Sequence, residues 1–183
     1  MGKITVVCNL TLDGVMQAPG RADEDTRDGF EHGGWAVPYS GDAMGRLMGD
    51  TTQAALLLGR VTYEAFADFW PKQVGNPYTE VLDQQQKFVV SSTLVDPLPW
   101  VNSTVVKASD VAKLKQEQDL VILGSGGLVS SIQDQIDEYK LLIHPLALGS
   151  GRRLFRSHTA LQLVDSVSTT TGVIIATYHP VGN

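Results

Sequence analysis

Two short apolar runs in this chain each stop at a glycine-rich turn, and each turn leads directly into a helical pattern. Residues 54–58 run into Gly59-Arg60-Val61-Thr62, and residues 120–123 run into Gly124-Ser125-Gly126-Gly127. Such short, wholly apolar runs are typical of strands that are buried on both faces, as in a parallel sheet. The pattern therefore predicts an α/β fold in which both turns lie at the carboxyl edge of one sheet.

The remainder of the chain alternates strands with helices and then ends in strands alone. Further strands are expected at residues 4–10, 88–91, 104–107, 139–146, 161–168 and 173–179, and helices at residues 42–52, 62–70, 78–86, 110–118 and 128–136. No helical pattern separates the last two strands, and Thr171-Gly172 is typical of a hairpin turn. We expect a single domain, residues 1–183, with one mixed, mostly parallel sheet, antiparallel C-terminal strands and helices on both faces.

Residues 17–41 form a connection that is too long to serve only as a link. Its aromatic residues Phe30, Trp35 and Tyr39 predict that it packs on the domain. Two roles are open for Trp35, either lining a substrate pocket or packing. The acidic run at residues 23–25 is expected to be a solvated part of this loop, and Asp110 is expected to cap the helix that follows it.

Charge and composition exclude several classes of function. The formal net charge of −6 argues against general binding of nucleic acid or of an anionic membrane surface. A single cysteine, Cys8, excludes an intrachain disulfide and a cysteine-rich zinc site, so no metal is expected. No apolar stretch approaches the roughly 18–20 residues of a membrane helix, so we expect a soluble, cytoplasmic protein.

The two glycine-rich turns are candidate anion sites. The start of a helix presents unpaired N–H groups, and glycine allows a phosphate to approach the backbone closely. Two such turns suit the two phosphates of a dinucleotide, with Arg60 as a charged clamp. The alternative is that both are merely tight turns, because neither matches the Rossmann or Walker A pattern.

Five segments together resemble a known family. They are NLTLDGV at 9–15, LLLGRVTYEAFADFW at 56–70, KFVVSSTL at 87–94, LVILGSGGL at 120–128 and DEYKLLIHPLALGSGRRLF at 137–155. In this order they look like the reductase domain of the bifunctional riboflavin-biosynthesis deaminase-reductase, a member of the dihydrofolate-reductase-like superfamily. The resemblance covers residues 4–179 and is greatest to stand-alone proteins of the dihydrofolate reductase family.

This resemblance implies a dihydrofolate-reductase-like three-layer fold, NADPH as the hydride donor, and a homodimer. It assigns Gly59, Arg60 and Thr62 to phosphates on the adenosine side, and Ser91 and Ser92 to the adenine ribose. It further assigns pyrophosphate contacts to Gly124, Ser125, Gly126, Gly127, Leu128 and Val129, and nicotinamide contacts to Cys8, Asn9, Met16 and Gln17.

The chain departs from the family pattern, and the preference between NADPH and NADH and the identity of the catalytic acid stay open. Leu128 stands where dihydrofolate reductases often have a basic residue, so a preference for NADPH over NADH depends mainly on Arg60. Asp42 is the candidate catalytic acid, with an N-cap as its alternative role. Asp13 is expected to be a turn residue, and His144 a satisfied structural residue. The deaminase half is absent, because the chain has no H-x-E…P-C-x-x-C zinc signature.

The segment from Gly149 to Arg153 has two possible roles, a third anion site for a substrate phosphate or a loop shaped for packing or dimer contact. The function expected overall is an NADPH-dependent reductase that transfers hydride to a small heterocyclic or carbonyl/imine substrate. The alternatives are a pyrimidine reductase of riboflavin biosynthesis, a nucleotide-binding module without turnover, and a domain that binds no nucleotide.

Overall fold

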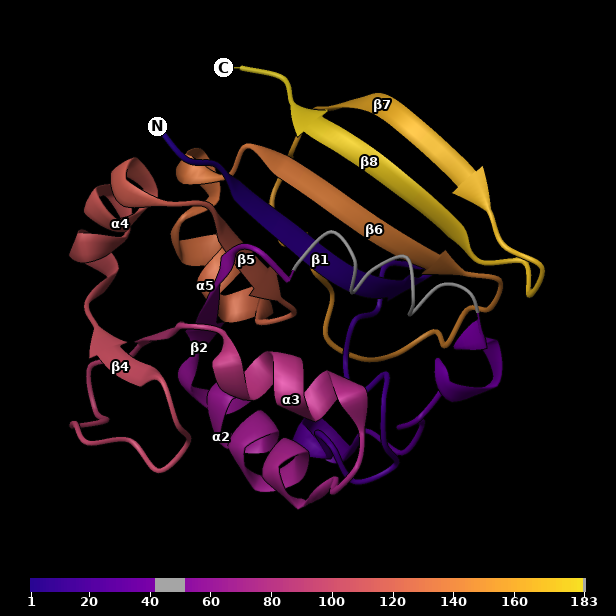
Figure 1. The fold of residues 1–183 in the computed structure, drawn as a ribbon. Coiled ribbons are helices and arrows are strands. Elements are labelled where there is room, and N and C mark those ends of the chain that lie inside the picture. The colour runs from indigo at the N-terminus through magenta and orange to yellow at the C-terminus, as the bar shows by residue number, and fades with distance from the viewer. Residues whose placement is uncertain (42–51, 183) are drawn as a thin grey trace.

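The computed structural model describes residues 1–41 and 52–182, which are built around one eight-stranded sheet (Figure 1). Its strands are β1 (Ile4–Thr11), β2 (Ala55–Gly59), β3 (Lys87–Val90), β4 (Ser103–Val106), β5 (Leu120–Leu123), β6 (Glu138–His144), β7 (Leu161–Ser168) and β8 (Ile174–Pro180). Every strand expected from the sequence is present, within two residues at each end. The helix expected at residues 42–52 falls almost wholly outside the described residues.

The strand order is β4-β3-β2-β5-β1-β6-β8-β7, and it divides the sheet into two parts. From β4 to β6 all neighbours are parallel, whereas β8 pairs antiparallel with both β6 and β7. Strand β1 is central, with Val7 opposite Leu123 of β5 and Lys140 of β6. The expected mixed, mostly parallel sheet with an antiparallel C-terminal part is therefore confirmed.

Within the described residues, four helices lie between parallel strands, as the alternating pattern predicts, whereas β3 and β4 are joined by a loop. They are α2 (Arg60–Phe69), α3 (Pro77–Gln84), α4 (Val111–Glu117) and α5 (Gly126–Ser131). Helix α2 begins two residues earlier than expected, since Gly59 is the last extended residue, with φ −78° and ψ 157°. Arg60 is thus the first residue of a helix rather than part of a loop.

Helix α5 is shorter than the expected span of residues 128–136. It begins at Gly126 and breaks at Ile132, whose φ of −126° and ψ of 26° leave the helical region, and the 3₁₀ turn η5 (Gln133–Gln135) follows. Ile132 and Ile136 are nevertheless both buried. The apolar spacing therefore correctly predicted which residues are buried, although the segment forms two short helical pieces instead of one helix.

The predicted capping role of Asp110 is wrong. Helix α4 begins at Val111, and the Asp110 side chain makes no capping bond to it. Instead, Asp110 Oδ2 accepts a hydrogen bond from the backbone N–H of Lys107 at 3.1 Å. The 3₁₀ turn η4 (Ala108–Asp110) directly precedes α4, and the Asp110 carboxylate closes this turn instead of capping the helix.

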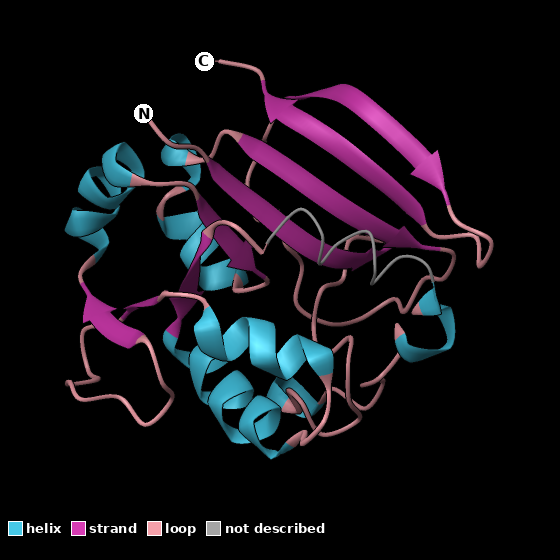
Figure 2. Ribbon diagram, in the orientation of Figure 1, coloured by secondary structure: helices cyan, strands magenta, loops and turns pink. Residues whose placement is uncertain are grey.

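The core forms two layers, because successive side chains of a strand point to opposite faces of the sheet. In β1, Val6 and Cys8 join the cluster that contains Leu128 of α5. Val7 joins the other cluster, which contains Tyr63 of α2. The helices therefore cover both faces of the parallel part of the sheet, and α2 and α3 lie together on one of them (Figure 2).

The connection after β1 packs on the domain, as its aromatic residues predicted. Val15, Ala18, Phe30 and Trp35 are buried in a third apolar cluster. This cluster fixes the loop over the carboxyl end of β1, where the parallel strands end.

Candidate functional site

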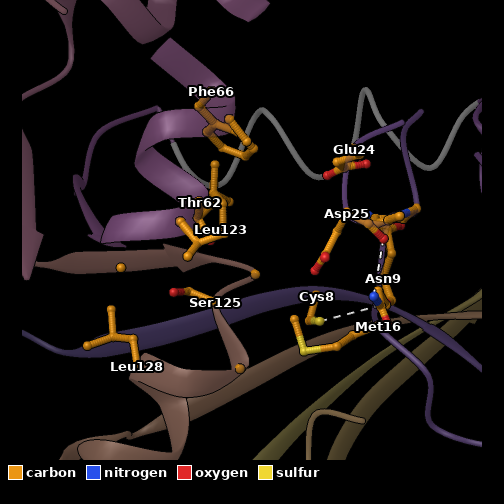
Figure 3. A pocket seen from close by; sticks show the side chains of 18 of the residues that line it. Cys8, Asn9, Met16, Glu24, Asp25, Thr62, Phe66, Leu123, Ser125 and Leu128 are labelled. Carbon is orange, nitrogen blue, oxygen red and sulfur yellow. Dashed lines mark hydrogen bonds between the residues drawn. The ribbon is translucent and has the colours of Figure 1, made fainter. Parts of the chain in front are cut away.

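A cavity of about 1030 Å³ opens at the carboxyl edge of the sheet, where β1, β2 and β5 end (Figure 3). Both glycine-rich turns line it, together with residues 7–9 of β1 and parts of the loop after β1. A volume of this size is at the upper end of the range of about 300–1,000 Å³ that is usual for small-molecule sites. The cavity can accommodate an extended ligand that reaches from one turn to the other.

The first turn lies at the start of α2, where residues 59–62 all line the cavity. Arg60 is half exposed, and its Nη1 lies 3.2 Å from Glu64 Oε2, one helical turn further on. The N–H groups at the start of α2 have no helical partner, so this end of the helix favours an anion. The ion pair with Glu64 holds the Arg60 guanidinium along the helix, and an anionic ligand in the cavity would compete with Glu64 for it.

The second turn has an unusual backbone, because Gly124 and Ser125 both have φ of 71°. It contacts the first turn directly. A Cβ atom on Gly59 would lie only 2.2 Å from Ser125 Oγ, so glycine at position 59 lets the two turns touch. A Cβ atom on Gly126 would likewise lie 2.8 Å from Met16 Sδ, which places Met16 against the second turn. Leu128 lines the cavity, whereas the side chain of Val129 is buried in the core.

The floor of the cavity is formed by β1, including Cys8 and Asn9. Burial raises the pKa of the Cys8 thiol to about 12, so this group stays protonated and is a poor nucleophile at neutral pH. Cys8 Sγ donates to the backbone oxygen of Asn9 at 3.4 Å. The thiol therefore contributes shape to the site rather than charge.

His144 holds Asn9 from behind the floor. It is only 2% exposed, and its Nε2 lies 2.9 Å from Asn9 Oδ1. Burial lowers the pKa of His144 to about 4, so the ring is neutral and donates from Nε2. Its other nitrogen, Nδ1, has no hydrogen-bond partner among the residues that the structure describes. The expectation of a satisfied residue is thus met at one ring nitrogen, and the rings of Trp35 and Tyr39 pack edge-on against the imidazole.

Gln17 fastens the loop over the cavity. Its Nε2 donates to the backbone oxygens of Asp25 and Arg27, at 3.1 and 3.0 Å, and its Oε1 accepts from the backbone N–H of Arg152 at 3.0 Å. The indole N–H of Trp35 donates to the backbone oxygen of Gln17 at 2.7 Å. Trp35 is buried and does not line the cavity, which favours its packing role over the predicted contact with substrate.

The acidic run of the loop is only partly solvated. Asp23 is exposed as expected, but Glu24 and Asp25 line the cavity, and Figure 3 shows both side chains at it. The side-chain hydrogen bond from Arg27 lowers the pKa of Asp25, which keeps that carboxylate ionised. Glu24 Oε2 accepts from the backbone N–H of Gly20 at 2.7 Å. Sequence reasoning missed both residues, because only the folding of the loop brings them to the site.

The remaining predicted site residues have other surroundings. Asp42, the candidate acid, lies outside the described residues. Asp13 has a turn role, since the hydrogen bond from Thr11 and the N–H groups of the 148–149 segment lower its pKa to about 2. Ser91 Oγ accepts from the backbone of Thr93 and Leu94 at the end of β3, and neither Ser91 nor Ser92 lines the cavity.

The segment from Gly149 to Arg153 packs against the loop after β1, which supports the packing alternative. Gly151 has φ of 119°, and a Cβ atom there would lie 2.7 Å from Val15 Cγ1. The same segment also carries charge to the cavity, which Arg152 and Arg153 line. Arg156, which sequence reasoning did not single out, lines it as well.

Residues 1–41 and 52–182 contain neither a metal-binding cluster nor a helix that could cross a membrane. No group of three or more histidine, cysteine, aspartate or glutamate side chains there could hold a metal ion. None of the helices in that part of the chain has the length and apolar character needed to cross a membrane.

Comparisons with known proteins show what this chain is similar to. An uncharacterized protein of Bacillus subtilis, YyaP, is 25% identical over 137 residues, which cover 68% of this chain and 72% of that protein. A putative riboflavin biosynthesis protein from Shewanella has a similar structure, with a TM-score of 0.66 and 22% identity over 98% of this chain and 99% of its own.

A dihydrofolate reductase from Enterococcus faecalis, solved with NADP(H) and RAB-propyl, has the same TM-score of 0.66 at 16% identity, over 98% of this chain and 96% of its own. These similarities confirm the dihydrofolate-reductase-like fold. The family model for the RibD C-terminal domain matches residues 2–175, nearly the whole chain. The protein therefore belongs to the RibD C-terminal domain family.

Proposed function

We propose that this protein is an NADPH-dependent reductase that transfers hydride to a small heterocyclic or carbonyl/imine substrate. One observation carries the proposal. Two glycine-rich turns from distant parts of the sequence touch each other at Gly59 and Ser125, and both line one cavity whose floor is the central strand. Membership of the RibD C-terminal domain family supports a reductase.

The residues present fit a dinucleotide. Gly127 lines the cavity and has nothing within 4 Å of where its Cβ would be, so a ligand can approach the backbone of the second turn there. Arg60 and the start of α2 supply positive charge at one end of the cavity. The floor at the other end presents a protonated thiol and the amide of Asn9.

In this assignment Gly59, Arg60 and Thr62 hold phosphates on the adenosine side, and residues 124–129 surround the pyrophosphate. Cys8, Asn9, Met16 and Gln17 lie around the nicotinamide. Ser91 and Ser92 do not line the cavity but directly follow Val90, which does, so the adenine ribose would meet them only beyond the edge of the cavity. When bound, NADPH supplies the hydride. The protein orients the reacting atoms, excludes water with the loop after β1, and delivers a proton from Asp42 or from water.

Asn9 has a defined part in this arrangement. Because His144 Nε2 donates to Asn9 Oδ1, the Nδ2 group of Asn9 is left free to donate to a carbonyl oxygen in the cavity. This donor suits either the carboxamide of the nicotinamide or a carbonyl of the substrate.

Titration calorimetry with NADPH and NADH tests the proposal. We expect wild type to bind NADPH more tightly, because Arg60 can pair with the 2′-phosphate. Arg60→Ala should lose about tenfold in affinity for NADPH and little for NADH. Lys113→Ala, which removes an exposed charge away from the cavity, serves as the matched control. Failure of wild type to bind either nucleotide would refute the proposal.

A second candidate is a true pyrimidine reductase of riboflavin biosynthesis, which the family match favours. Its substrate carries a ribose phosphate, for which the arginines of residues 152–156 are available. Oxidation of NADPH in the presence of the aminopyrimidine substrate would establish this activity. Oxidation with other reducible heterocycles alone would favour the broader proposal.

We also propose that the protein is a homodimer. Strand β7 is one of the two edge strands of the sheet, and its Leu163 and Val164 are each 53% exposed. An exposed apolar edge strand is a ready site for pairing with another chain. Sedimentation equilibrium should give twice the chain mass, and Leu163→Glu should shift the protein toward monomer.

A further inference from the structure

The arginines of the described chain differ in whether they have an acidic partner. Each of four pairs with a carboxylate: Arg21 with Asp23, Arg27 with Asp25, Arg60 with Glu64 and Arg152 with Asp28. Arg153 and Arg156 have no ion pair or side-chain hydrogen bond with any residue that the structure describes. Both of these unpaired arginines line the cavity.

An unneutralised pair of guanidinium groups is unexpected in this protein. Its formal net charge is −6, so carboxylates outnumber cationic side chains. Two positive groups without acidic partners on the wall of one cavity favour the binding of an anion there. The planar guanidinium matches phosphate oxygens in a bidentate geometry, which makes phosphate the best-fitting ligand class.

The backbone places these arginines beside the second glycine-rich turn. Arg153 pairs with Val15 in an isolated antiparallel bridge, and the backbone oxygen of Arg153 lies 3.8 Å from where a Cβ of Gly126 would be. Between the two arginines, Leu154 is fully buried and anchors the segment to the core. The pair is therefore held at the Gly124–Leu128 side of the cavity, by a segment distant from that turn in sequence.

We propose that Arg153 and Arg156 bind the pyrophosphate of the dinucleotide and supply the positive charge that the second turn lacks. Residues 124–128 contain no basic side chain. The inference rests on the proposed function, and it assigns a different binding role to each side of the cavity. Arg60 recognises the 2′-phosphate of NADPH, whereas Arg153 and Arg156 hold the pyrophosphate that NADPH and NADH share.

A double variant separates these roles. Arg153→Ala/Arg156→Ala should weaken NADPH and NADH by the same factor, about tenfold or more, and leave the ratio of the two affinities unchanged. Arg60→Ala should change that ratio. The control Lys107→Ala/Lys113→Ala removes the same charge from exposed positions away from the cavity and should bind both nucleotides like wild type. The thermal midpoint of the double variant without nucleotide should match wild type, because neither guanidinium has a partner in the described chain.

Each other outcome has a distinct meaning. If the double variant binds both dinucleotides like wild type, the inference is overturned while the proposed function stands. If it loses inorganic phosphate binding but not dinucleotide binding, the pair serves a substrate phosphate and the assignment to the cofactor is wrong. If only the NADPH affinity falls, the pair reads the 2′-phosphate, which also overturns the assignment. Failure of wild type to bind either dinucleotide refutes the proposed function itself.

Discussion

The two sides of the cavity are built in different ways. The first side is local, since Gly59, Arg60, Thr62 and the partner Glu64 lie within one strand end and one turn and a half of α2. The second side is assembled from residues 124–128, from Met16 in the loop after β1, and from residues 152–156 after β6.

This difference has a consequence for stability as well as for binding. On the local side Arg60 and Glu64 are half exposed and pair within one helix, so a substitution of either should affect mainly the ligand. An assembled side exists only when distant segments pack together, so a substitution at its contacts should also lower the free energy of unfolding. Substitutions on the two sides therefore distinguish these two modes of construction.

The largest effect is expected for Gly151→Ala on the assembled side. Position 151 has φ of 119°, and a Cβ atom would lie 2.7 Å from Val15 Cγ1 and 2.8 Å from Phe30 Cε2, both in the apolar cluster under the loop. Backbone strain and overpacking together should lower the free energy of unfolding by about 3–4 kcal/mol. Urea denaturation followed by circular dichroism measures the loss.

Gly149→Ala is the matched control for that measurement. Gly149 has φ of 77°, but nothing lies within 4 Å of where its Cβ would be. Only the strain of a left-handed alanine remains, about 1 kcal/mol. Equal losses for the two variants would show that the packing of Gly151 against Val15 and Phe30 carries no energy.

The next effect concerns His144 and pH. Burial lowers its pKa from 6.5 to about 4, so the folded protein disfavours the charged ring that the unfolded chain accepts. Since the unfolded state binds more protons in this range, stability is complete above pH 6.5 and falls as the pH drops toward 4. The free energy of unfolding should fall by about 3 kcal/mol, because a tenfold difference in proton affinity between the two states corresponds to about 1.4 kcal/mol.

Comparing wild type with His144→Gln isolates this contribution from that of the carboxylates. Asp13, whose pKa is lowered to about 2, loses its contribution only at lower pH, as the pH falls below its ordinary value of 3.8. The difference in unfolding free energy between the two proteins should therefore change between pH 6.5 and 4. A difference that is constant with pH would contradict a buried, neutral His144.

Sequence reasoning predicted the local side well and the assembled side poorly, for a physical reason. The apolar run before Gly59 and the helical spacing after it predict that turn from nearby residues alone. The start of α2 differed by two residues, and the bounds of β2 and the end of α2 by one. Nothing in the sequence near Gly126 indicates that Met16 and Arg153 will lie beside it. Such contacts depend on how the chain returns after β6.

The same reason accounts for the misjudged acidic residues. The run at residues 23–25 looks like a solvated loop because charge without periodicity predicts exposure. In the folded loop Gln17 binds the backbone of Asp25 and Arg27, and Glu24 accepts from the backbone of Gly20, so that Glu24 and Asp25 line the cavity. The burial of Trp35 has a similar cause, since its indole N–H donates to the backbone carbonyl of Gln17 rather than to a ligand.

The smallest effect is expected for Cys8, on the floor that both sides share. With a pKa of about 12 the thiol is almost wholly protonated at pH 8, so iodoacetamide should modify the native protein far more slowly than the urea-unfolded chain. Cys8→Ala should cost about 1 kcal/mol of stability and leave nucleotide affinity within about twofold of wild type. Mass spectrometry of timed samples measures the modification rate. Native Cys8 that is alkylated as fast as the unfolded chain would mean that the floor is open to solvent and that neither side of the cavity is closed over it.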